Sequence, residues 1–341
     1  MSECRYFHVE VGKGMRQVGS LEEALAARGS GGYIWVDMFD PARPELDVVA
    51  ARLGIHPLAV EDCFDSNQVP KVEDYPGYTF ILCNRYSYGE RRLTVEEVDL
   101  FLGKDFLVSV GGRGGGGRPT FERIEAIAAR AIGTVERGPD FLLHVILDVT
   151  VDGKVEAIEP LEDDIEAAEE GILRDVTGFR LDSLVQLRRA LLSLRKSLFH
   201  EREILVKICR RDSPFVSEEA IYHFRDIYDH LAKFFEFTEM NRDLLANLTE
   251  MYLSLINNRM ARVANRTNKS VRRLTLITTI FMPLSLLAGI GGMSEWSMMT
   301  GPGNWRFAYP AFGVAMVLIG VASYLLLKRV ERREGSHRDR S

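Results

Sequence analysis

The sequence predicts an α+β head, built from a mixed sheet with helices, followed by a helical hairpin, a very long stalk helix and two transmembrane helices. Three observations support this fold class. Strand-like apolar runs occur within the first 118 residues. No proline or glycine interrupts residues 218–280, which favours one unusually long helix. Residues 274–294 and 307–327 contain no charged side chain, and about twenty helical residues cover the hydrocarbon core of a bilayer.

Residues 1–118 are predicted to form a cytoplasmic α/β domain. Strand-like apolar runs occur at 33–38, 78–83 and 105–110, and the last two have a length suited to a covered sheet. Between them, residues 44–54 show helical spacing of apolar side chains, with Gly54 as a stop signal. The glycine-rich segment 111–118 lacks the Gly-Lys-Ser/Thr ending of a phosphate-binding loop, so we expect a flexible connection there.

Residues 119–273 are predicted to be helical. Periodic apolar positions in two runs joined near Gly178 indicate an antiparallel helical hairpin. The long helix then begins near Ser217, and its apolar seam passes to Asn258, Asn265 and Asn268 closer to the first span. Asparagine in a bundle seam weakens packing, and a row of asparagines leading into a membrane favours a water-filled interior.

The two spans, 274–294 and 307–327, are joined by an outer loop, 295–306, and followed by a tail, 328–341. Although the formal net charge is −6, basic residues flank the spans. They are Arg262, Arg266, Lys269, Arg272 and Arg273 before the first, and Lys328, Arg329, Arg332 and Arg333 after the second. By the positive-inside rule both termini are cytoplasmic. The first residues lack the pattern of a secretory signal, so we expect a multi-pass protein of the cell (inner) membrane.

The first span has one polar face that could line a pathway. Its members share helical spacing with Asn268 and Leu274, and they are Thr278, Met282, Ser285 and Gly289. The alternative is helix packing, because small and hydroxylated residues also pack transmembrane helices. Two spans enclose little space, so a pathway requires several copies around an axis. Neither span carries an acidic or basic residue, which argues against a proton relay and suits a hydrated ion such as Mg²⁺.

Several motifs resemble those of the CorA family of divalent-cation channels. The strongest is Phe-Met-Pro-Leu-Ser-Leu-Leu-Ala-Gly-Ile-Gly-Gly-Met-Ser at 281–294, at the end of a long helix and before a second span. Further matches, in the family's order and over nearly the whole chain, are at 56–63, 70–75, 98–110, 224–230 and 265–271.

This resemblance implies a homopentamer shaped as a funnel, in which five first spans line the pore. It assigns regulatory Mg²⁺ binding between subunits to Asp62 and Asp226. It also assigns Asn268, Leu274, Met282 and Ser285 to the pore, with Leu274 and Met282 in a hydrophobic gate. Bound Mg²⁺ would offset repulsion between carboxylates of neighbouring subunits and hold the ring closed.

The outer mouth departs from the family signature Gly-Met-Asn. Here the residues are Gly292, Met293 and Ser294, followed by Glu295 as the one acid of the outer loop. A serine ring is wider than an asparagine ring and offers weaker acceptors, which puts Mg²⁺ selectivity in question. The ZntB branch, which moves Zn²⁺, also departs at that asparagine. His223 and His230 share a helix face with Asp226 and would favour Zn²⁺ or Co²⁺ if they bind metal.

The sequence therefore predicts a divalent-cation channel, most consistent with Mg²⁺ and extending to Co²⁺ or Ni²⁺. One alternative is a ZntB-like Zn²⁺ transporter, and another is a non-conducting membrane protein that retains the metal-sensing head. We expect no enzyme, because no nucleophile–base set is present, and no catalytic cofactor. We expect no nucleic-acid partner, because basic residues cluster only beside the spans.

Overall fold

The computed structural model describes residues 2–29, 31–65, 68–112, 119–292, 301 and 303–338. Its contacts divide the chain into two units, residues 1–252 and residues 253–341. Helix α9 (Ile221–Gly291) is continuous across this boundary.

The first unit contains a seven-stranded mixed sheet, ordered β2-β1-β3-β7-β6-β5-β4. Neighbouring strands are antiparallel except β3 and β7, which are parallel. The strands are β1 (Glu3–Glu10), β2 (Gly14–Val18), β3 (Tyr33–Phe39), β4 (Lys71–Tyr75), β5 (Tyr78–Gly89), β6 (Arg92–Gly103) and β7 (Phe106–Gly111). Every residue of β7 is buried, as expected for a strand covered on both faces.

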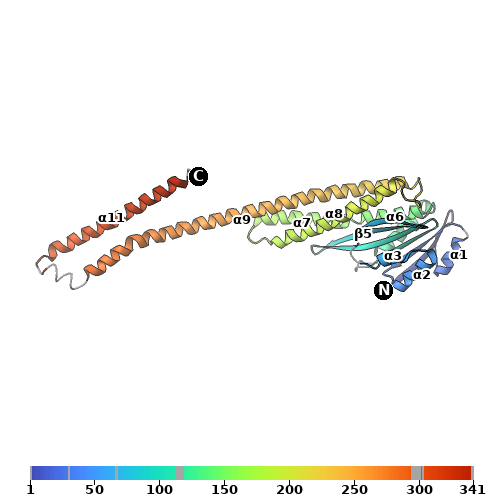
Figure 1. Cartoon of the computed structure of the whole chain (residues 1–341), viewed down its shortest axis with the longest axis horizontal. Coiled ribbons are helices and arrows are strands. Elements are labelled where there is room, and N and C mark those ends of the chain that lie inside the picture. Colours follow the sequence, from blue (N-terminus) through green and yellow to red (C-terminus); the bar gives the residue numbers. More distant parts are fainter. Residues whose placement is uncertain are drawn as a thin grey trace. The chain divides into compact units, whose positions relative to one another are not determined.

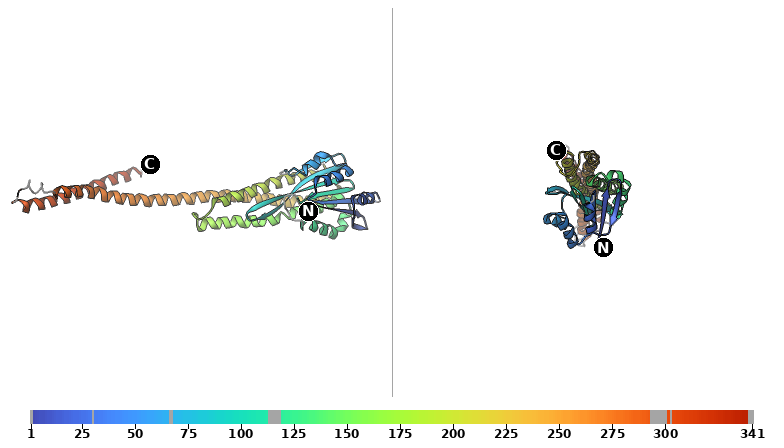
Figure 2. Two further views of the ribbon diagram at one scale, coloured as in Figure 1. Left: turned by 90° about the horizontal axis from the view of Figure 1, so that it is seen from below. Right: turned by 90° about the vertical axis from the view of Figure 1, so that its right-hand side faces the viewer.

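Helices cover both faces of the sheet (Figures 1 and 2). One face packs its apolar side chains against α1 (Leu21–Arg28), α2 (Arg43–Leu53) and α3 (Pro57–Asp62). The other contacts helices that follow the glycine-rich segment: α4 (Pro119–Arg130), α5 (Ile132–Val135), α6 (Pro139–Asp152), α7 (Val155–Arg174) and α8 (Leu181–Cys209). The predicted hairpin is present as α7 and α8, which lie side by side.

A buried polar network joins the parallel strands β3 and β7. Asp37 and Ser109 are opposite each other in the ladder. The Ser109 hydroxyl donates to Asp37 Oδ1 at 2.7 Å and accepts from Trp35 Nε1 at 2.9 Å. Arg5 Nη2 lies 3.5 Å from Asp37 Oδ2. Burial raises the pKa of Asp37 to about 6, although the Ser109 hydrogen bond and the Arg5 charge oppose that shift.

A second buried network ties α8 to β5. Lys154 is fully buried, and its ammonium donates to the Asn84 carbonyl and to Glu201 Oε1. Glu201 also accepts from the Asn84 backbone N–H and the Ser197 hydroxyl, each at 3.0 Å. A buried ion pair tolerates its desolvation only when such additional hydrogen bonds satisfy both charges.

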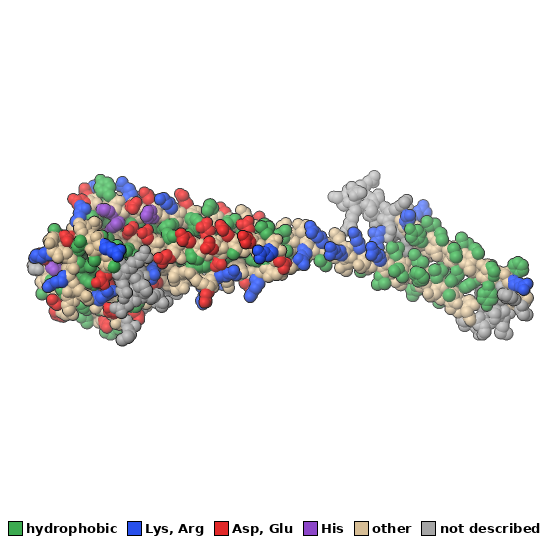
Figure 3. All heavy atoms as spheres, turned by 180° about the vertical axis from the view of Figure 1, so that it is seen from behind, with side chains coloured by type: hydrophobic (Ala, Val, Ile, Leu, Met, Phe, Trp, Pro, Cys, Tyr) green, Lys and Arg blue, Asp and Glu red, His purple; other side chains and the backbone are tan. Residues whose placement is uncertain are grey.

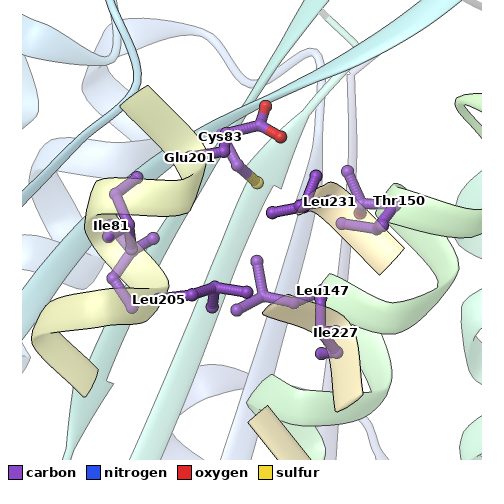
Figure 4. Close-up of a pocket in the computed structure, with 10 residues that line it drawn as sticks. Ile81, Cys83, Leu147, Thr150, Glu201, Leu205, Ile227 and Leu231 are labelled. Carbon is purple, nitrogen blue, oxygen red and sulfur yellow. The ribbon is translucent and has the colours of Figure 1, made fainter. Parts of the chain in front are cut away.

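Glu201 and Cys83 lie beside a small cavity between β5, α6, α8 and α9 (Figure 4). Its remaining lining is mostly aliphatic, including Leu147, Ile227 and Leu231. It has room for only about one water molecule. This cavity is too small for an organic ligand, so we assign it to imperfect packing of the core.

The described part of the second unit contains the end of α9 and helix α11 (Trp305–Arg338). Both helices are long and apolar enough to cross a membrane, and their apolar windows are not buried within the chain. The two helices pack closely, because a side chain placed on Gly291 would meet the Phe312 ring at 2.7 Å. A side chain on Gly320 would lie 3.6 Å from Leu284, which is ordinary van der Waals contact. Small residues permit this approach between membrane helices.

The structure differs from the sequence predictions at the N-terminal edge of the sheet. The β1–β2 hairpin was not predicted, although Gly12 and Gly14 provide the positive φ angles that its turn requires. Helix α9 continues through Pro283 to Gly291, as expected for a first span that forms the end of the long helix. Proline has no backbone N–H, so Pro283 makes no hydrogen bond to the Thr279 carbonyl one turn earlier.

Candidate cation-binding site and pore-lining helix

Six histidine and aspartate side chains, which are residue types able to bind metals, gather where α6 packs against α9. On each helix they are separated by three or four residues, so they share one face. This α6–α9 cluster consists of His144, Asp148 and Asp152 from α6 with His223, Asp226 and His230 from α9. The His144 and His223 rings lie 4.9 Å apart between centroids, and His230 Nδ1 lies 3.6 Å from Asp152 Oδ1.

His144 has the properties of a metal ligand. Burial and, to a smaller extent, the neighbouring His223 lower its pKa to about 4, while Asp226 opposes the shift. The ring is therefore neutral at pH 7. Its Nδ1 atom is buried and has no hydrogen-bond partner among the described residues. A neutral imidazole with an unpaired nitrogen is the form that binds Zn²⁺, Co²⁺ or Ni²⁺.

The carboxylates of the cluster also fit a cation. Ligand atoms of Asp148, Asp152 and His230 all lie within 4.8 Å of one another. Burial raises the pKa of Asp148, and the charges of Asp152 and Asp226 raise it further against the opposing effect of His230. A cation between these groups would replace carboxylate repulsion by attraction. The donor set of oxygens and imidazoles suits either Mg²⁺ through water or a borderline transition metal directly.

Asp62 lies elsewhere in the head, as the last residue of α3. Its carboxylate accepts hydrogen bonds from Gln68 Nε2 at 2.8 Å and Lys71 Nζ at 2.7 Å. Burial lowers the pKa of Lys71, but its hydrogen bonds to Asp62 and Glu73 outweigh that effect and raise it. Asp62 also lines an open hollow that contains three further carboxylates, those of Glu61, Asp65 and Glu73.

Asp62 and Asp226 share no contact among the described residues of the single chain. Asp226 is exposed on α9 and belongs to the α6–α9 cluster. The sequence reasoning identified Asp226, His223 and His230 as possible ligands but missed their α6 partners. The sequence signal for the α6 partners was the four-residue spacing of His144, Asp148 and Asp152, which places them on one helix face. This spacing indicates a possible metal site only once α6 is known to pack against α9.

The predicted pore positions lie on the part of α9 that belongs to the second unit. Asn268, Leu274, Thr278, Met282 and Ser285 are all exposed in the single chain. The Thr278 hydroxyl donates to the Leu274 carbonyl at 2.9 Å. Because its proton is used within the helix, its oxygen remains available to accept a hydrogen bond from ion-bound water.

The packing of α11 separates two faces of α9. Leu284 and Gly291, which contact α11, are seven residues apart and share one face. Met282 and Ser285 lie on a different face, which α11 leaves exposed. Gly292 is exposed in the turn after α9. Met293, Ser294 and Glu295 lie outside the described residues.

The fold and these two sites define the class of protein. It is a membrane protein with two helices long and apolar enough to span a bilayer and an α+β head in which Asp148, Asp152 and His230 are close enough together to hold a cation.

The chain belongs to the family described as CorA-like Mg²⁺ transporter protein, which matches residues 30–329. It is 32% identical over 313 residues to the cobalt/magnesium transport protein CorA of Thermotoga maritima, covering 91% of this chain and 86% of that protein. It is 31% identical to the putative metal ion transporter YfjQ of Bacillus subtilis, covering 87% and 89% of the two chains.

The structure of the CorA magnesium transporter from Methanocaldococcus jannaschii is similar in fold. It matches with a TM-score of 0.67 and 22% identity, over 96% of this chain and 97% of that chain. The predicted α+β head with a long apolar helix and a second apolar helix is therefore confirmed.

Proposed function

We propose that this chain is a transporter of divalent cations and that it forms a homopentameric channel, with Mg²⁺ as the main ion and Co²⁺ or Ni²⁺ as further substrates. Family membership supports the divalent-cation class. The observation that carries the channel architecture is the exposed face of α9 with Thr278, Met282 and Ser285, which α11 does not cover. Five copies would bring these faces around one axis and enclose a pathway.

The proposed pore combines hydroxyl rings with an apolar constriction. Thr278 and Ser285 would present oxygens to the hydration shell of the ion, and Leu274 and Met282 would form a gate that closes by dewetting. Gly292, Met293 and Ser294 would form the outer mouth, with Glu295 concentrating cations there. Asn268 would extend the polar lining toward the cytoplasm. These roles rest on the family resemblance and on the helix face just described.

In this proposal the head regulates the pore. Asp62 and Asp226 would bind Mg²⁺ between neighbouring subunits and hold the ring closed while internal Mg²⁺ is abundant. In the single chain Lys71 already neutralises Asp62, so metal binding there must displace or accommodate Lys71. Both termini would be cytoplasmic in the cell (inner) membrane, with residues 1–118 and 119–273 as the two parts of the cytoplasmic region.

The test is ion influx into liposomes that contain the purified full-length protein. Mg²⁺ entry that internal Mg²⁺ suppresses supports the proposal. Thr278→Val should reduce influx, because it removes only the hydroxyl, whereas Thr279→Val makes the same change about 100° around the helix and should have little effect. Equal influx in both variants would place the pathway on another face of α9.

Regulation can be tested with a second matched pair. Asp226→Asn should weaken suppression by internal Mg²⁺, because it removes one of the two carboxylates proposed to bind Mg²⁺ between neighbouring subunits. Asp229→Asn makes the same change on the same helix outside the cluster and should leave suppression unchanged. Native mass spectrometry of the detergent-solubilised protein measures the number of subunits, and any number other than five contradicts the pentamer.

Zn²⁺ transport is a second candidate function, and three imidazoles in the α6–α9 cluster favour it. Zn²⁺ influx without Mg²⁺ influx would select it. Ser294→Asn separates both candidates from a non-conducting sensor. A gain in Mg²⁺ influx would indicate an intact pore with altered selectivity, whereas a folded oligomer that passes no ion in either form would refute transport.

A further inference from the structure

Five basic side chains form one stripe along the part of α9 that precedes its apolar segment. They are spaced by three or four residues, so they share one helix face. The members of this basic stripe are Arg259, Arg262, Arg266, Lys269 and Arg273. All five are exposed. Lys and Arg gather next to the apolar surface in Figure 3. No acidic residue occurs between Glu250 and Glu295, so this part of the helix supplies no carboxylate to the stripe.

The basic stripe points away from the proposed pore. Met282 follows Arg273 by nine residues, which is about two and a half helical turns and therefore the opposite face. Leu284 lies eleven residues after Arg273, which is about three helical turns, and Gly291 lies eighteen residues after Arg273, which is about five turns. Both residues are therefore on the same face of α9 as Arg273. Both of those residues contact α11. The stripe therefore continues the face of α9 that carries α11.

The end of α11 adds positive charge on the same side of the apolar segments. Lys328 and Arg329 directly follow the uncharged run 307–327, and both are exposed. The Leu284–Gly320 contact shows that the two apolar segments lie alongside each other. Basic residues therefore border the apolar surface on both helices at one end.

The stripe members differ in their distance from the apolar segment. With a rise of about 1.5 Å per residue, Arg273 and Lys269 lie within about 8 Å of Leu274 along the helix axis. Arg262 and Arg259 lie about 18 and 23 Å away. The Debye length at physiological ionic strength is about 8 Å. Only the near members can interact strongly with charge at a membrane surface.

We propose that Lys269 and Arg273, with the basic end of α11, bind the phosphate headgroups of anionic phospholipids in the cytoplasmic leaflet. The inference rests on the proposed orientation, in which this end of both helices is cytoplasmic. Guanidinium and ammonium groups donate charge-assisted hydrogen bonds to phosphate oxygens. Each Lys or Arg side chain close to an anionic surface increases the affinity for an anionic lipid, relative to a neutral lipid, by about fivefold. The far members, Arg259 and Arg262, contribute little because salt screens them.

The test uses two double variants of the full-length protein that change the charge equally. Lys269→Gln/Arg273→Gln alters the near pair, and Arg259→Gln/Arg262→Gln alters the far pair. Phosphatidylglycerol or phosphatidylcholine is titrated into the protein in a neutral detergent, and native mass spectrometry measures the bound lipid. The near variant should need about twenty-five times more phosphatidylglycerol for half-saturation. The far variant should stay within about twofold of the wild type, and raised salt should abolish the preference for phosphatidylglycerol.

Three results would overturn the proposal. The first is equal binding of the two lipids by the wild type, and the second is an equal loss in both variants. The third is a near variant that binds phosphatidylglycerol normally but loses its oligomeric state in lipid-free detergent, because the stripe would then pair with another protein chain. Lipid binding is measured without ion flux. If the protein binds phosphatidylglycerol through the near pair but conducts no ion, the proposed channel function is refuted and the proposed lipid binding is not.

Discussion

Replacing Asp37 by asparagine should change how the stability of the head depends on pH. Asp37 is 2% exposed, and burial raises the pKa of its carboxyl from 3.8 to about 6. In the wild type, as the pH rises from 4 to 7, the Asp37 carboxyl loses its proton at a lower pH in the unfolded state than in the folded state, because its pKa is lower in the unfolded state. The unfolded state then binds fewer protons, so the free energy of unfolding falls as pH rises. Asp37→Asn removes this dependence.

The size of the effect follows from the shift. A difference of about two pKa units corresponds to about 3 kcal/mol at 1.36 kcal/mol per unit. Asparagine retains an oxygen that can accept from Ser109 Oγ, which now donates at 2.7 Å. Of this total of about 3 kcal/mol, about 2 kcal/mol develops between pH 4 and pH 7, because the carboxyl of the unfolded state is already partly ionised at pH 4, and the free energy of unfolding of the variant should rise by that amount relative to the wild type. The attraction between Arg5 and the ionised Asp37 carboxylate is already contained in the pKa of about 6.

Urea unfolding of the full-length protein in detergent measures this difference, followed by fluorescence of Trp35, which belongs to the same network. Trp296 and Trp305 are first replaced by phenylalanine so that Trp35 is the only reporter. Asp47→Asn makes the same substitution at an exposed position of α2 and serves as the control. A relative stability of Asp37→Asn that is constant between pH 4 and pH 7 would refute the argument that burial dominates at Asp37.

Two further predictions concern packing. Glu201→Leu should lower the free energy of unfolding, measured by thermal unfolding, by about 3–5 kcal/mol, because it leaves the Lys154 ammonium buried without its carboxylate partner. Lys154→Met/Glu201→Leu should recover most of that loss, and an equally unstable double variant would show that the pair itself is stabilising. Gly291→Leu should cost about 1–3 kcal/mol, because its side chain would overlap the Phe312 ring. Gly313→Leu, which meets no atom within 4 Å among the described residues, should unfold like the wild type.

The sequence was most informative where one physical requirement dominates. The strand at 33–38 and the spans could be predicted because their apolar runs match the length that a covered strand or a membrane helix needs. The helix at 44–54 ended at Gly54 as expected, in the left-handed conformation with φ of 73°. These signals are local and do not depend on what packs against them.

The missed features depend on distant partners. The strands β1 and β2 mix charged and apolar residues, so only their pairing with each other and with β3 makes them strands. The α6 half of the cluster was missed because His144 and Asp148 lie within a largely apolar helix, and their role depends on α9 packing beside them. The predicted roles of Asp62 and of the outer mouth depend on neighbouring copies, which the single chain does not contain.

Pro283 has a consequence for solvent within the bilayer. A proline at this position of α9 deprives the Thr279 carbonyl of its ordinary donor four residues later. In hydrocarbon, an unsatisfied carbonyl costs several kcal/mol. Continuity of the helix through Pro283 therefore calls for a hydrogen-bond donor near Thr279 at that depth, and a water-filled lumen would supply one. Infrared spectroscopy with an isotope-labelled Thr279 carbonyl would report that hydration independently of any transported ion.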